Sequence, residues 1–185
     1  MRTLWLGLLL LIPGCRVPTT GPVRLARGVP FVLRAPEAGP KFFASQEVVF
    51  HPPGGGAETL LTAVENDGKR LSIVASTPVG LTLFTVQVQG GAATVDARVP
   101  LPARLDPRLL PALVQLANWP LEDLRLGLEA GALLQDAGPV RTLSRKGRVV
   151  LTLTRDGQAP PFRSVAVAIP ALGITLDIRT LEEAP

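Results

Sequence analysis

Few side chains in this sequence could support catalysis or bind a metal. His51 is the only histidine of the 185 residues; it precedes two prolines in an expected loop, and no Gly-x-Ser-x-Gly motif accompanies it. One histidine and one cysteine cannot supply a zinc site. The acidic pairs at 122–123 and 182–183 are typical of a helix start and of a charged tail, not of an acid/base pair. We therefore expect no enzyme activity, no metal and no cofactor.

Cys15 is the one cysteine of the chain, and its place at the end of an apolar segment gives it a chemical role. Residues 1–14 carry one positive charge, Arg2, followed by an apolar run over 4–12. That run is shorter than the roughly 20 residues of a transmembrane helix and is typical of a secretory signal peptide.

The residues around Cys15 resemble a bacterial lipobox, with the aliphatic Ile12 three positions before the cysteine and the small Gly14 directly before it. Pro13 is an uncommon residue in such a motif. The thiol would be the nucleophile that accepts a diacylglyceryl group. The alternative is an ordinary signal peptide with an incidental cysteine. Arg16 rather than aspartate follows, which by resemblance to the bacterial sorting rule implies the outer membrane, with the domain in the periplasm.

Composition and charge limit the remaining function classes. The 18 glycines and 19 prolines favour many turns and short strands. The net charge of +4 is scattered, without basic runs interleaved with aromatic residues, so we expect no nucleic-acid binding. Weak attraction to anionic lipid head groups is compatible with this charge. We expect a signal peptide over 1–14, a lipidated, Pro/Gly-rich tether over 15–40 and a single monomeric domain over 41–185.

Apolar and polar residues alternate through most of that domain, which predicts antiparallel strands with one apolar face. The expected strands cover residues 42–50, 59–65, 70–76, 81–89, 94–99, 140–144, 148–154, 163–169 and 173–180. Asp106 followed by Pro107 predicts the N-cap of a helix, and Trp119 followed by Pro120 predicts a second helix that ends near Gly131.

These elements predict a mainly β fold with two short helices, in which both helices lie against the concave face of one curved, open antiparallel sheet. That arrangement buries the apolar faces of the strands and of the helices together. A transmembrane barrel is disfavoured, because the chain has no tyrosine, six phenylalanines and two tryptophans and so lacks aromatic girdles.

Two motifs resemble a family of uncharacterised bacterial outer-membrane lipoproteins. Residues 116–121, preceded by the Pro-containing run 101–107, match that family's Leu-x-x-Trp-Pro element, and residues 77–84 match its Thr-Pro-x-Gly-x-x-x-Phe element. Asn118 stands where the family usually has an aromatic residue. The resemblance spans roughly residues 41–180.

Genes of this family often lie beside those for aryl-polyene and fatty-acid-like products, and its fold is similar to LolA and LolB, the carrier and receptor of lipoproteins. The resemblance implies an open half-barrel that binds or hands on an acyl or polyene lipid, or a lipoprotein. A non-catalytic accessory lipoprotein that scaffolds a partner protein is the alternative. Core packing is the alternative role for each candidate lining residue. The candidates are Leu71, Ile73, Leu83, Phe84, Trp119, Val149, Leu151, Val167 and Leu176.

Overall fold

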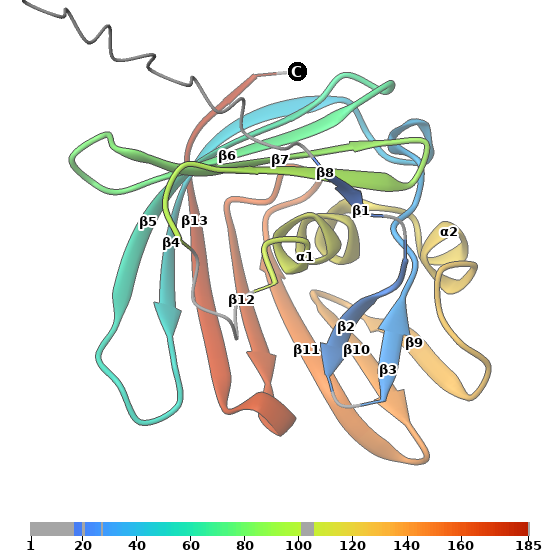
Figure 1. Ribbon diagram of the computed structural model, residues 1–185. Coiled ribbons are helices and arrows are strands. Elements are labelled where there is room, and N and C mark those ends of the chain that lie inside the picture. The colour runs from blue at the N-terminus through green and yellow to red at the C-terminus, as the bar shows by residue number, and fades with distance from the viewer. Residues whose placement is uncertain (1–16, 20, 27, 101–105, 185) are drawn as a thin grey trace, which may run out of the picture.

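The computed structural model describes residues 17–184 with the exception of residues 20, 27 and 101–105 (Figure 1). The predicted signal peptide, Cys15 and Arg16 lie outside the described residues. The strands are β1 Val17–Thr19, β2 Val23–Ala26, β3 Val29–Phe31, β4 Phe42–His51, β5 Glu58–Asn66, β6 Leu71–Ser76, β7 Thr82–Gln89, β8 Ala92–Ala97, β9 Ala132–Ala137, β10 Val140–Arg145, β11 Arg148–Asp156, β12 Ser164–Ile169 and β13 Ile174–Ala184. The helices are α1 Leu109–Asn118 and α2 Leu121–Arg125, with 3₁₀ turns η1 Pro36–Ala38 and η2 Pro170–Leu172.

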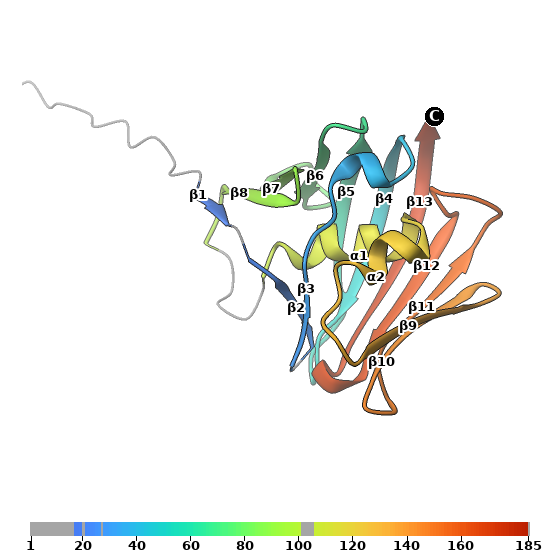
Figure 2. The same cartoon turned by 90° about the vertical axis from the view of Figure 1, so that its right-hand side faces the viewer.

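Eleven of the described strands form one antiparallel sheet in the order β1-β8-β7-β6-β5-β4-β13-β12-β11-β10-β9. The two outer strands, β1 and β9, do not pair with each other, so the sheet is open. It curves around α1, which lies on the concave side, while α2 packs on β9 (Figures 1 and 2). The predicted mainly β, open and curved antiparallel sheet with two short helices is confirmed.

Side-chain alternation defines an inner, concave face and an outer face of this sheet. In β6 the apolar Leu71, Ile73 and Ala75 are all buried, while the residues that alternate with them, at 72, 74 and 76, are partly exposed. The same alternation places Leu176 of β13 inward and its polar neighbours outward, as predicted. The core therefore lies between the concave face of the sheet and the elements that cover it.

The helices begin and end somewhat differently from the prediction. Asp106 is not the N-cap of α1, which begins after Arg108; instead, the Asp106 carboxylate accepts a hydrogen bond from the Arg108 backbone N–H, 3.0 Å long. Helix α2 ends at Arg125 rather than near Gly131. Beyond Arg125 the chain pairs with the segment after β3: the Gly127 carbonyl oxygen accepts a hydrogen bond from the Val32 N–H at 2.8 Å, and Leu128 forms a β-bridge with Phe31.

The N-terminal segment differs most from the sequence-based expectation. A tether was expected over residues 15–40, but β1 in its described part pairs with the sheet edge at β8, and β2 and β3 form a separate hairpin. This hairpin buries Val23, Leu25 and Phe31 completely. The segment is ordered because its apolar side chains help α1 to fill the concave side, which the strands of residues 41–185 alone would leave open.

Candidate functional site

Buried polar side chains hold α1 in place on the concave face. Arg141 is 3% exposed and points inward from β10, where its guanidinium donates to the carbonyl oxygens of Leu116 and Trp119 at 2.7 and 2.9 Å. The same guanidinium makes two hydrogen bonds with the Asp136 carboxylate, of 2.7 and 2.8 Å. These bonds lower the pKa of Asp136. Positive charge at the carboxyl end of a helix also complements the helix dipole.

A strap formed by residues 32–40 crosses α1 and is fixed by two buried amide side chains. Gln115 of α1 pairs with the backbone of Arg34 in both directions, accepting from its N–H and donating to its carbonyl oxygen at 2.8 and 2.7 Å. Asn66 of β5 donates to the carbonyl oxygens of Pro36 and Pro40. Sequence reasoning missed these anchors. Their one signal is a polar residue at an inward position of an otherwise apolar face, as with Arg141 beside Leu143.

Seven of the nine predicted lining residues belong to the packed core around α1. Each is at most 4% exposed, so none of them now borders an open surface: Leu71, Ile73, Phe84, Trp119, Leu151, Val167 and Leu176. All except Trp119, which directly follows α1, come from strands of the concave face. They are brought together as one apolar surface.

The other two predicted lining residues lie at β-bulges, and the prediction is wrong for Val149. A register shift after Leu143 places Val149 opposite Ser144, on the outer face, where 51% of it is exposed. The extra residue, Val150, turns inward instead. Leu83 falls at a second register shift, in β7, and is only partly buried, whereas Phe84 fills the inner position. A bulge breaks the two-residue period on which the prediction relied.

The apolar inner face continues beyond the part that α1 and the β2–β3 hairpin cover. Leu60 lies opposite the buried Val48, and Phe50 lies opposite the buried Leu176, so all four share the inner face. Leu60, Phe50 and Ile174 are only partly buried, although they pack against the core. They mark the open end of the inner face, which is formed by the end of β4 and the starts of β5 and β13 (Figure 1).

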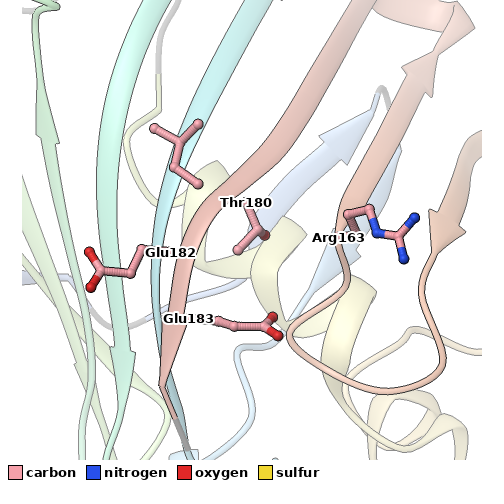
Figure 3. Close-up of a pocket in the computed structure, with 5 residues that line it drawn as sticks. Arg163, Thr180, Glu182 and Glu183 are labelled. Atoms are coloured by element: carbon pink, nitrogen blue, oxygen red, sulfur yellow. The ribbon is translucent and has the colours of Figure 1, made fainter.

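A hollow of about 250 Å³ lies at the opposite end of β13 (Figure 3). Its lining consists of Arg163, Thr180, Leu181, Glu182 and Glu183. Glu182 and Glu183 point to different sides of the strand in Figure 3, so the two carboxylates do not converge. This acidic pair, predicted as a tail, continues β13 along β4.

The described residues offer no other concentration of reactive groups. His51 is partly exposed, and its Nε2 lies 3.1 Å from the Asp177 carboxylate on the neighbouring strand. Among the described residues, no serine forms a hydrogen bond with it. Within the described ranges no group of three or more histidine, cysteine or acidic side chains is placed to hold a metal, and no helix is long and apolar enough to cross a membrane.

Comparison with known proteins finds similar solved structures and one family. A LolA superfamily protein from Nitrosomonas europaea has a TM-score of 0.46 and 8% identity, covering 80% of this chain and 89% of that one. A proposed outer membrane lipoprotein-sorting protein domain from Vibrio parahaemolyticus has a TM-score of 0.44 and 13% identity, covering 78% and 84%. No curated protein matches the sequence. The model of the family described as "Protein of unknown function (DUF3261)" matches residues 44–182, and the chain therefore belongs to this family.

Proposed function

We propose that this protein is a lipid-anchored protein of the bacterial outer membrane, and that it binds an acyl or polyene lipid, or the lipid part of a lipoprotein, on its inner face. The observation that carries the proposal is the continuity of that face. Its apolar side chains run from the packed core to the open end, where Phe50, Leu60 and Ile174 keep solvent-accessible surface.

Physical chemistry favours a hydrocarbon ligand at this place. Burying apolar surface contributes about 25 cal/mol per Å², and a hydrocarbon chain needs few polar partners. A ligand could extend along the open end, and could reach the residues under α1 only by displacing covering side chains. Trp119 is 1% exposed and donates weakly to the Ala35 carbonyl oxygen at 3.5 Å. Displacement of the covering side chains would change this buried environment of the Trp119 ring.

The test uses a chain that begins at residue 17, which retains every described strand and helix and has Trp119 as its only tryptophan. Folding is checked by circular dichroism. We expect saturable binding of a C16 acyl probe, with lipid co-purifying from the native envelope protein.

The matched variants are Leu60→Gln, on the inner face, and Leu61→Gln, on the outer face of the same strand. Probe binding that both variants weaken equally, or that is absent from a folded wild-type chain, would contradict the proposal.

Attachment through Cys15 is a separate part of the proposal, based on the lipobox-like residues. In the native host, we expect the wild-type protein to sediment with outer membranes and to carry covalent acyl groups. Cys15→Ser should lose the acyl groups. A mature protein with an unmodified Cys15 would refute this part without affecting the proposed lipid binding.

A scaffolding role remains the second candidate, since the packing of the seven lining residues favours it. A scaffold has a filled core and offers exposed apolar side chains to a partner protein. It would take up no acyl probe and would instead co-purify with a protein in a fixed ratio, which distinguishes the two candidates.

A further inference from the structure

Basic side chains cluster at the same end of the molecule as the open end of the inner face. The turn between β10 and β11 carries Arg145, Lys146 and Arg148. It lies against the β2–β3 turn, since a Cβ atom on Gly28 would be 2.9 Å from an Arg145 guanidinium nitrogen. Figures 1 and 2 show both turns at the lower end of the molecule, and β2 adds the exposed Arg24.

Acidic side chains neutralise only part of this cluster. Arg145 lies 3.4 Å from the Glu129 carboxylate. Among the described residues, Lys146, Arg148 and Arg24 have no ion-pair partner within 4.0 Å. The opposite end carries both signs, with exposed Glu182 and Glu183 and with Asp67 in the same turn as Lys69 and Arg70. The three cations without such a partner lie at the end where the inner face opens.

Two exposed aliphatic side chains accompany the basic turn. Leu133 of β9 and Val149 of β11 both lie opposite Ser144 of β10, so they stand on one face, two strands apart, about 10 Å from each other. They are 50% and 51% exposed. Aliphatic side chains beside unpaired cations are the combination by which peripheral proteins bind an anionic lipid surface, the former entering the interface and the latter contacting phosphates.

We propose that this basic rim, formed by Arg24, Arg145, Lys146 and Arg148 with Leu133 and Val149, docks on a bilayer that carries anionic phospholipids. Docking presents the open end of the inner face to the source or the acceptor of the lipid. The suggested purpose of docking, which is delivery of a lipid to or from the inner face, rests on the proposed function. The docking itself requires only the basic rim. A membrane fits better than an acidic protein, because the aliphatic pair is flanked by flexible cations and not by a shaped pocket.

The experiment measures flotation of the chain from residue 17 with vesicles of phosphatidylethanolamine and phosphatidylglycerol, compared with phosphatidylcholine alone. Each cation near an anionic surface contributes about five-fold to partitioning. The double variant Lys146→Gln/Arg148→Gln should therefore bind the anionic vesicles about 25-fold more weakly. Lys69→Gln/Arg70→Gln, the matched control at the opposite end, changes the net charge equally and should bind as the wild type does.

Salt and the aliphatic pair provide further readouts. Rising ionic strength should weaken binding of the wild type, because the Debye length is about 10 Å at 0.1 M salt. Leu133→Ser/Val149→Ser should weaken the binding that persists at high salt. All variants are checked for wild-type melting temperature.

Three results would overturn the inference: equal binding to neutral and anionic vesicles, equal losses in the two charge variants, or binding to polyglutamate as tight as to vesicles. The proposed function fails separately. A chain that floats with anionic vesicles but takes up no acyl probe keeps the docking surface and loses the lipid-binding face.

Discussion

Replacing Gly39 by alanine should destabilise the protein substantially, although glycine is not required there by its backbone. Gly39 has φ −110° and ψ 169°, an extended conformation that alanine adopts freely. The added Cβ atom, however, would lie within 2.5 Å of three atoms of the Trp119 ring, where ordinary contacts are 3.4–4 Å. Since Trp119 is buried, its ring must move by about 1 Å against packed neighbours.

The expected loss follows from two costs. Overpacking a core typically costs about 1–3 kcal/mol, and moving the ring also breaks the 3.5 Å hydrogen bond from Trp119 Nε1 to Ala35, which contributes about 1 kcal/mol at most. We expect the free energy of unfolding to fall by about 3 kcal/mol and the melting temperature by about 6–12 °C. Urea unfolding followed by circular dichroism measures both the fall and any change in cooperativity.

Two comparisons make this prediction specific. Gly56 has nothing within 4 Å of an added Cβ, so Gly56→Ala should change stability by less than about 0.5 kcal/mol. In a Trp119→Ala background the clash disappears, and Gly39→Ala should then be nearly neutral. If Gly39→Ala is as stable as Gly56→Ala, or costs the same with and without the tryptophan ring, the strap does not pack on Trp119 as described.

Three further predictions concern the buried polar groups. Arg141→Met should lower the free energy of unfolding by about 3–5 kcal/mol, because it leaves the carbonyls of Leu116 and Trp119 without their donor and Asp136 with Arg155 alone; Arg163→Met, at an exposed ion pair, should cost under 1 kcal/mol in the same urea titration. The pKa of Asp136 is lowered in the folded state, so its stabilising effect is present above pH 4 and is lost as the pH falls below it; Asp136→Asn should flatten the decline of stability below pH 4. Thr62→Val should keep or raise the melting temperature, since the buried Thr62 hydroxyl has no hydrogen-bond partner in the described part of the chain and a methyl group has the same shape; a clear drop would show that the hydroxyl is bonded.

The alternating strands were predictable because each carries its own period-two signal. Leu71, Ile73 and Ala75 are inward, as their spacing predicts, because nothing interrupts the ladder between them. Val149 shows where this reasoning ends. Its strand looks regular in the sequence, but an extra residue, Val150, lies between the partners of Leu143 and Ser144, and only the pairing with β10 reveals it. Register between strands is a non-local property, so a single strand's pattern cannot reveal it.

The filling of the concave face could be predicted only in part. The two leucine-rich helices have helical spacing that a sequence displays directly, although Asp106 does not cap α1 as predicted. The β2–β3 hairpin does not, because each strand has three or four residues and Pro30 interrupts one of them. Its order comes from burial of Leu25 and Phe31 against elements far along the chain. The candidate site was likewise predictable only in part. Its apolar strands could be recognised from the sequence, whereas the polar anchors of α1 depend on tertiary contacts.

The shortness of β1 has a consequence for how far the domain can travel from a membrane. Only three residue pairs, Val17–Val95, Pro18–Thr94 and Thr19–Ala93, join it to the sheet edge, and Pro18 can donate no ladder hydrogen bond. If the lipid is attached at Cys15, unpairing β1 from β8 would add residues 17–22 to the linker between the lipid and the domain, which lengthens that linker by about 20 Å. The domain would then have two possible distances from the bilayer. With β1 paired it is held close to the bilayer, and with β1 unpaired the basic rim can turn toward the bilayer.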